Sequence, residues 1–299
     1  MYIIKNKKIF ILISVALVAL ALTFIFVFGL KLSIDFKGGA LAEINYPDGR
    51  PEISLIQDKV NSLGLGNVLV QPTGENGYLV KTKDLTEPER VKLFDSFSID
   101  GEYGVDEKSF TSIGPSVGKE LRRKALISMI LVILAIIIFI AFVFRSVSRP
   151  VSSWKYGVIA ILALIHDVAI PTGLFAILGK YAGAEVDTLF VVGLLTIMGL
   201  SVNDTIVVFD RIRENLKAHT SGSFAETVGK SIKQTFTRSI NTSLTVILAL
   251  LVLYFFGPVS TKYFALTLTA GMFFGTYSSI FLASPLLVLT ENIQRKKHK

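Results

Sequence analysis

The chain of 299 residues contains no cysteine, only three histidines and few charged residues. Without cysteine it can form no disulfide, thiolate nucleophile or cysteine-ligated metal site. The histidines lie far apart, at positions 166, 219 and 298, so they do not indicate a metal site either. Charged residues make up 18% of the chain and apolar residues 51%, which is less charge than a soluble protein of this length carries.

Motifs for nucleotide or peptide hydrolysis are also missing. The segment from Gly114 to Glu120 resembles a phosphate-binding loop, but it is one residue too short and has no Ser or Thr after Lys119. The sequence has no His-Glu-x-x-His and no Gly-x-Ser-x-Gly pattern. We therefore expect no enzyme activity, no metal and no cofactor, so any work must draw on an ion gradient or on partners.

Long apolar runs are present in their place. Six runs reach or approach the ~20 residues that cross a hydrocarbon core. They are Ile9–Leu30, Ala125–Phe144, Tyr156–Leu178, Thr188–Phe209, Ser239–Phe256 and Tyr263–Thr290. The first is too long for a signal-peptide core, so we expect it to remain as a membrane span. The sequence predicts a membrane-embedded, all-α bundle of six helices.

The basic residues predict the orientation of this bundle. With a cytoplasmic N-terminus, the cytoplasmic segments 1–8, 145–155, 210–238 and 291–299 carry sixteen Lys and Arg residues. The short external loops carry only Lys180 and Lys262. A basic group at 119–124 breaks the rule, which long translocated domains obey poorly. We expect a multi-pass protein of the inner (plasma) membrane with both termini in the cytoplasm.

Residues 31–124 have a mixed pattern and predict one external domain. Two amphipathic segments, 54–63 and 87–97, alternate with strand-like segments at 40–46, 68–70, 78–80 and within 103–113. The first has apolar residues at helical spacing, namely Leu55, Ile56, Val60 and Leu63, and in the second we expect Val91, Phe94 and Phe97 on one face. The βαββαβ order is typical of a small α+β ferredoxin-like domain. It is acidic, with 13 acidic and 7 basic residues over 38–118. The positive net charge of +8 therefore comes from residues beside the membrane spans, which indicates anionic membrane lipid rather than nucleic acid as their partner.

The expected domains are therefore four. They are residues 1–30 (N-terminus and first span), 31–124 (external domain), 125–290 (five spans with the cytoplasmic loop 210–238) and 291–299 (basic tail).

Asp204 is the most informative single residue. It follows Asn203 inside the fourth span, where a carboxylate costs about 2.5–3.5 kcal/mol on insertion scales. Arg238 lies at the start of the fifth span, on the same side of the membrane if the two helices pack as neighbours. The pair would weaken when Asp204 is protonated, which is the behaviour of an ion-gated switch. The alternative is a buried acid that only holds helices together.

Three further features concern the helix interior; the first two are open between function and packing, and the third is mainly structural. His166 and Asp167 at the centre of the third span could extend a proton path or form a self-satisfied polar pair. The polar start of the fifth span could hydrogen-bond an ion, a file of water or Asp204, although for most of its residues we favour ordinary interhelical hydrogen bonds; these residues are Ser239, Asn241, Thr242, Ser243 and Thr245. In the last span Gly271, Gly275, Ser279 and Ala283 recur every four residues and predict close helix contact.

Several blocks of the sequence belong together. One is Asp35-Phe36-Lys37-Gly38-Gly39 after the first span, preceded by Ser33. The others are the segment 112–118, His166-Asp167, and the segments 201–215, 238–243 and 275–280. In this order the blocks resemble the SecD/SecF family, and the SecF branch in particular. The first is similar to the family's Gly-x-Asp-Phe-x-Gly-Gly signature, with Ser33 in place of the first Gly.

The resemblance implies half of an RND-like bundle that works with SecD and assists the SecYEG channel. Such subunits use a proton or sodium gradient to help release the exported polypeptide. Residues matching Asp204 and Arg238 are implicated in that coupling, and a SecD carboxylate completes the site. A stand-alone RND-like transporter of lipid or drug and a passive scaffold are the alternatives.

Overall fold

A computed structural model describes residues 2–66, 68–144, 151–218 and 222–297. The described chain forms two compact units, and each is treated by itself here. One is helical and comprises Met1–Lys31 and Ser128–Lys299. The other comprises Leu32–Ile127 and contains the sheet. Arg145 and Arg149, which belong to the predicted orientation signal, and His219 lie outside the described residues.

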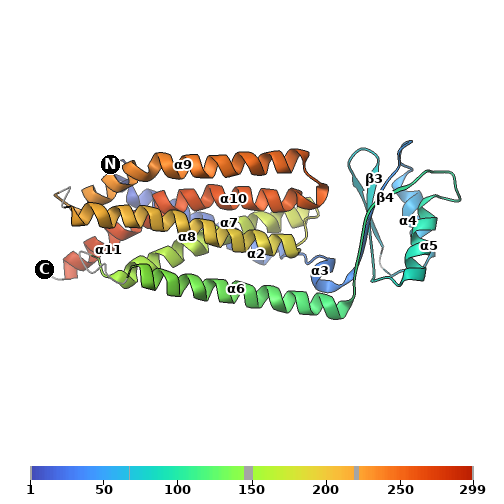
Figure 1. Ribbon diagram of the computed structural model, residues 1–299, viewed down its shortest axis with the longest axis horizontal. Helices are drawn as coiled ribbons and strands as arrows, with labels where there is room; N and C mark the ends of the chain where they lie inside the picture. Colours follow the sequence, from blue (N-terminus) through green and yellow to red (C-terminus); the bar gives the residue numbers. More distant parts are fainter. Residues whose placement is uncertain (1, 67, 145–150, 219–221, 298–299) are drawn as a thin grey trace. The chain divides into compact units, whose positions relative to one another are not determined.

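The helical unit is a bundle of long helices whose two chain ends lie at the same end (Figure 1). Six helices among the described residues are long and apolar enough to cross a membrane. The elements are α1 (Tyr2–Lys5), α2 (Lys7–Phe28), α6 (Pro115–Val143), α7 (Ser153–Tyr181), α8 (Thr188–Lys217), α9 (Phe224–Phe256), η1 (Val259–Thr261), α10 (Lys262–Ser278), η2 (Ser279–Ala283) and α11 (Ser284–Lys297).

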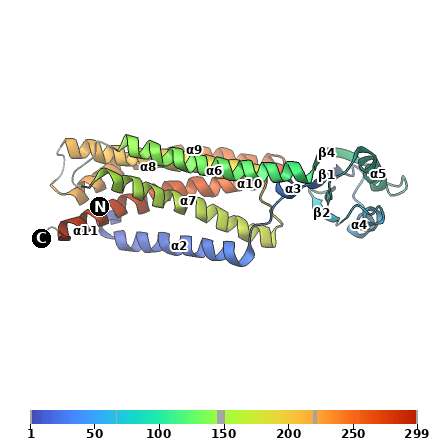
Figure 2. The ribbon, with the colours of Figure 1, turned by 90° about the horizontal axis from the view of Figure 1, so that it is seen from below.

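The core of the bundle is formed by α7, α8 and the α10–α11 span, whose apolar windows are at least half buried. The windows of α2, α6 and α9 are less than one-fifth buried. Helix α2 lies along α7, as Figure 2 shows, and α10 packs against both α8 and α9. The outer helices expose apolar side chains such as Phe26, Ile138 and Phe255, which suits a hydrocarbon surrounding.

Two features of the helices go beyond the predicted apolar runs. The predicted loop 210–238, whose sequence is basic and helix-prone, is mostly helical, because α8 continues to Lys217 and α9 begins at Phe224. A hydrogen bond joins the two extensions, because Asn215 Nδ2 of α8 donates to Ser231 Oγ of α9 at 2.8 Å. The start of α9 is also stabilised locally by a capping box between Ser223 and Glu226. The last span is not uniformly α-helical either, because η2 is a π-helical turn between α10 and α11.

The second unit has the element order β1 (Gly39–Asn45), α4 (Ile53–Ser62), β2 (Leu69–Thr73), β3 (Gly77–Thr82), α5 (Glu87–Phe97), β4 (Asp106–Ile113), preceded by the short helix α3 (Ile34–Lys37). Its four strands are all antiparallel, in the order β2-β3-β1-β4, with an irregularity between Glu43 and Ile44 in the β1–β4 ladder. Helices α4 and α5 cover one face of the sheet (Figures 1 and 2).

The core of this unit lies between the sheet and the two helices. It includes the fully buried Tyr46, whose hydroxyl donates to the Phe97 carbonyl at 3.0 Å. The expected helix faces are wrong at Leu55 and Val91, which are 45% and 51% exposed. In α5 the buried pair is Leu93 and Phe97, and Val91 lies two residues, or about 200°, away from Leu93.

Candidate functional site

The centre of the helical unit contains a buried carboxylate, Asp167 of α7. Its Oδ1 lies 2.8 Å from Nδ1 of His166, and both side chains are essentially fully buried. Its Oδ2 accepts hydrogen bonds from the hydroxyl of Ser278 at 2.7 Å and from that of Ser201. Asp167 is therefore held by α7, α8 and α10 at once, which satisfies the rule that an intramembrane acid must be paired.

Small residues make this close arrangement possible. A Cβ on Gly275 would lie 3.5 Å from Cβ of Ser201 and 3.8 Å from Asp167 Oδ2, and one on Gly271 would overlap the side chain of Ile197. These two glycines let α10 approach α8, so the small-residue pattern in the sequence corresponds to a helix contact beside the buried acid.

More hydroxyl groups continue from this point. Thr205 Oγ1 and Ser279 Oγ are 3.0 Å apart, and Ser279 is the first residue of the π-helical turn. Ser243 of α9 is hydrogen-bonded to Thr276 of α10. Single π turns within α-helices occur frequently at functional sites because they change which side chains face a cavity.

Asp204 lies one turn of α8 beyond Ser201. Its Oδ1 accepts a hydrogen bond from Ser239 Oγ at 2.6 Å, and its Oδ2 is buried without a partner among the described residues. Arg238 is exposed. In the described part of the chain no ion pair joins Arg238 to Asp204. The serine next to Arg238 makes the contact instead.

Asp204 and Arg238 nevertheless share a cavity of about 90 Å³ with the exposed Asn203. The cavity lies between α8, α9 and α10, and its remaining lining residues are Leu200, Ser201, Val207, Ser239, Thr242, Ser243, Gly271, Met272, Gly275 and Thr276. It brings together three of the residues at which the sequence predicted coupling, whereas His166 and Asp167 do not line it. Ser201 lines the cavity and also bonds to Asp167.

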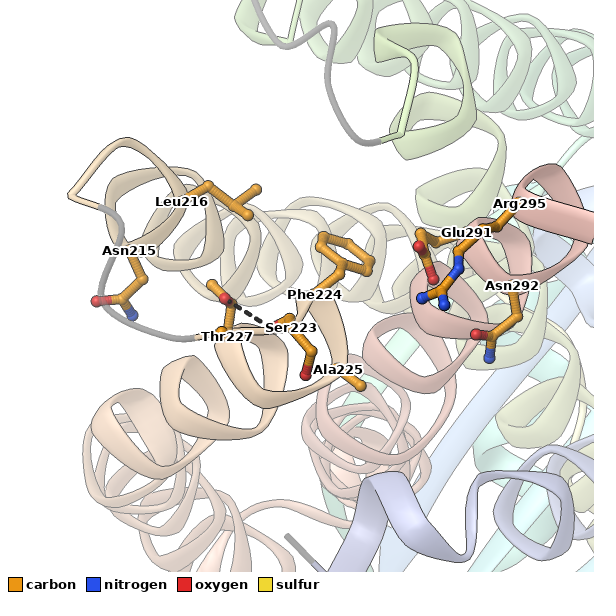
Figure 3. Close-up of a pocket in the computed structure, with 10 residues that line it drawn as sticks. Asn215, Leu216, Ser223, Phe224, Ala225, Thr227, Glu291, Asn292 and Arg295 are labelled. Atoms are coloured by element: carbon orange, nitrogen blue, oxygen red, sulfur yellow. Dashed lines mark hydrogen bonds between the residues drawn. The ribbon is translucent and has the colours of Figure 1, made fainter. Parts of the chain in front are cut away.

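A larger cavity of about 360 Å³ lies elsewhere, between the start of α9 and α11. Figure 3 shows Ser223 and Phe224 on one side of it and Glu291, Asn292 and Arg295 on the other. We place the candidate site at the smaller cavity, since neither buried carboxylate lines the larger one.

The Gly38-Gly39 signature lies in the other unit and has a structural basis. Ser33 caps α3 by accepting a hydrogen bond from the backbone N–H of Asp35 at 3.1 Å. Gly38 has a φ of +83°, and a Cβ there would lie 2.9 Å from Cα of Pro115. A Cβ on Gly118 would lie 2.9 Å from the backbone N of Gly38. The two blocks singled out in the sequence thus pack backbone to backbone.

Sequence reasoning missed the hydroxyl groups that bind Asp167. Ser201 and Ser278 are separated from it by 34 and 111 residues, and a serine in an apolar helix is as often simple packing. The available signal was the position of these serines in blocks that also contain an acid or a glycine stripe. The sequence pointed to Asp204 as the most informative acid, whereas in the structure Asp167 makes more hydrogen bonds and is more deeply buried.

Comparison with known proteins places this arrangement in a family. Residues 98–293 match the family model described as protein export membrane protein SecD/SecF, C-terminal. The chain belongs to the SecD/SecF family. Residues 23–46 also match the SecD/SecF GG motif, the block that contains Gly38 and Gly39. As a member of this family with six apolar helices, the chain is a multi-pass membrane protein of protein transport.

Relatives in the family match nearly the whole chain. Protein translocase subunit SecF of Thermobaculum terrenum is 42% identical over 97% of this chain and 94% of its own length. SecF of Anaerolinea thermophila is 39% identical with the same coverage. The crystal structure of SecDF from Thermus thermophilus, a translocon-associated membrane protein, superposes with a TM-score of 0.83 at 33% identity. It covers 98% of this chain, which spans 39% of the SecDF chain.

Proposed function

We propose that this chain is a SecF-type accessory subunit of the Sec translocase that uses a cation gradient to assist polypeptide export. SecF relatives that match it over almost their full length support the translocase role. SecDF relatives, in which a matching region is part of a longer chain, support a SecD-type partner. SecYEG and the exported polypeptide are the further partners of this proposal, and the chain contributes no enzymatic step.

The observation that carries the coupling role is the set of intramembrane acids. Asp204 has one hydrogen-bonded oxygen and one buried oxygen without a partner among the described residues, and it lines a cavity together with the exposed Arg238. A carboxylate in this setting can take up and release a proton, or bind a sodium ion through its free oxygen. Either event changes the charge at the contact between α8 and α9, so helix packing and occupancy of the site are linked.

The finer architecture belongs to the same proposal. The βαββαβ order and the all-antiparallel strand order support a ferredoxin-like domain outside the cytoplasm. The basic residues at 1–8, 155 and 211–238 support cytoplasmic termini in an inner-membrane bundle of RND type.

The test is export into membrane vesicles that contain SecYEG, the SecD-type partner and this chain. With Asp204→Asn we expect precursor export to fall to its rate without a gradient, because Asn cannot change charge. Asp210→Asn is the matched control: Asp210 lies on the same helix, half-exposed, and is paired with Arg213 at 3.2 Å. It should leave gradient stimulation intact.

Imposing a proton gradient and a sodium gradient separately identifies the ion. Full gradient stimulation of the Asp204→Asn variant by both ions would eliminate the coupling role, while the translocase assignment would stand.

A further inference from the structure

Three buried polar atoms on residues that do not line the smaller cavity have no hydrogen-bond partner among the described residues. They are Ser14 Oγ of α2, His166 Nε2 of α7 and the hydroxyl of Tyr277 of α10. Ser14 and His166 are each only 1% exposed. Buried polar atoms are nearly always paired, so three orphans on three helices require an explanation.

The packing of α2 on α7 brings Ser14 to the level of His166. The rings of Phe28 and Tyr181, at the C-terminal ends of the two helices, are 5.9 Å apart, so the helices run parallel. Further down, a Cβ on Gly173 would lie 2.6 Å from Ala21, which marks the closest approach. Ser14 and His166 each precede these contact residues by seven positions, or two turns on the same helix face.

Tyr277 is connected to the same place through aromatic rings. Its ring stacks on His166 with centroids 6.0 Å apart and on Phe281 with centroids 5.0 Å apart. Phe281 contacts Phe10, which lies one turn before Ser14 on α2, at 4.9 Å. Helix α2 therefore covers the pair formed by His166 and Tyr277, and the three orphan atoms border one region of the bundle.

We propose that Ser14, His166 and Tyr277 form a binding site for buried water. Each hydroxyl can donate and accept, and the imidazole nitrogen that faces away from Asp167 completes the site. A buried water typically makes two to four hydrogen bonds to groups of this kind. The site contains no carboxylate, which argues against a metal cation as its ligand.

With water at Nε2 and Asp167 at Nδ1, His166 can pass a proton from the water site to Asp167, a consequence that rests on the proposed ion coupling. A hydronium ion at the site transfers a proton to Nε2 and returns to water, while the Nδ1 proton passes to Asp167 Oδ1. His166 stays neutral with its proton moved from Nδ1 to Nε2, Asp167 becomes neutral, and the reverse transfers restore both. Asp167 is then loaded from the α2 side, whereas Asp204 lines a cavity to which α2 contributes no residue.

The site can be tested by solid-state NMR on the full chain in lipid bilayers, labelled with ¹⁵N-histidine. Replacing His219 and His298 with Gln leaves His166 as the only histidine. The measurement is magnetisation transfer from water protons to His166 Nε2. We expect transfer in the parent protein, loss in Ser14→Val, which fills the site, and weakening in Tyr277→Phe, which removes one hydroxyl.

Thr23→Val is the matched control, because Thr23 is an exposed hydroxyl on α2 that bonds only to Ala19 of its own helix. It should leave the transfer unchanged. Absence of transfer in the parent protein would overturn the water site, as would equal transfer in all variants. Should Ser14→Val fail to insert, Tyr277→Phe decides. Transfer should persist in Asp204→Asn, so failure here is separable from failure of the coupling assay.

Discussion

The contact between the Gly38 segment and the start of α6 leads to a sharp prediction. The three atoms nearest to a methyl group on Gly118 would all belong to the backbone: the N of Gly38 at 2.9 Å, and the carbonyl carbons of Phe36 and Lys37 at 3.3 and 3.4 Å. Backbone cannot rotate out of the way as a side chain can. Gly118→Ala must therefore separate the two segments.

The magnitude follows from two opposing terms. Overpacking of this kind costs about 1–3 kcal/mol. Alanine regains up to about 1 kcal/mol over glycine inside a helix. The net expectation is a loss of about 0–2 kcal/mol for Gly118→Ala.

Gly114 provides the matched control, four residues earlier. A Cβ at Gly114 meets nothing within 4 Å, and its φ is not in the left-handed region. Gly114→Ala should therefore be neutral, or stabilising by about 0.4–1 kcal/mol through the unfolded chain. The two alanine variants are expected to differ by about 2 kcal/mol, or roughly 30-fold in an equilibrium constant.

Native-state proteolysis of the full chain in lipid nanodiscs measures this difference. Lys37 is exposed and lies directly before Gly38, so trypsin cleavage at Lys37 reports opening of the contact. When reclosing is fast, the cleavage rate follows the population of the open form. We expect cleavage at Lys37 to be roughly 30-fold faster in Gly118→Ala than in Gly114→Ala. Equal rates would refute the backbone-contact explanation of the Gly-Gly signature.

Two further predictions concern single hydrogen-bonded groups. Ser278→Ala removes a donor from the buried Asp167 and should cost about 1–3 kcal/mol in reversible unfolding, whereas Thr269→Val, whose hydroxyl bonds only within α10, should change stability by less than about 0.5 kcal/mol; equal costs would contradict the role of Ser278. In the other unit, hydrogen bonds from Lys83 and Thr86 lower the pKa of Glu89 from 4.5 to about 2. Because the pKa of Glu89 is lower in the folded than in the unfolded protein, ionised Glu89 stabilises the fold at pH values above its unfolded-state pKa. This stabilisation is lost as the pH falls from about 4.5 towards 2. Glu89→Gln should therefore flatten the acid unfolding curve in that window, and an unchanged curve would contradict it.

Much of the fold follows from one-dimensional patterns. The apolar runs located all six long helices, and alternation with turn residues gave the order of strands and helices in the second unit. Both depend on local periodicity, which the sequence carries directly. The ends of α8 and α9 did not follow from hydropathy, because polar residues such as Asn215 continue these helices beyond their apolar parts.

The site was less accessible for a physical reason. Asp167 and Asp204 were identifiable because a carboxylate inside an apolar run is unusual. The hydroxyl groups that bind Asp167 depend on which faces of three helices pack together, and no pattern within one helix specifies that. The exchange of an Arg238 contact for a Ser239 contact at Asp204 likewise depends on a rotation of α9 by a single residue.

The π-helical turn η2 fixes the phase between α10 and α11. A π turn accommodates one residue more than an α turn, so the helix after it is rotated by about 100° relative to an uninterrupted α-helix. Ser284, Leu287 and Val288 of α11 are fully buried in that rotated position. Loss of one residue within η2 would turn these three side chains out of their buried positions while Ser278, which precedes the turn, kept its place beside Asp167. The extra residue thus lets one continuous span satisfy two differently oriented neighbours.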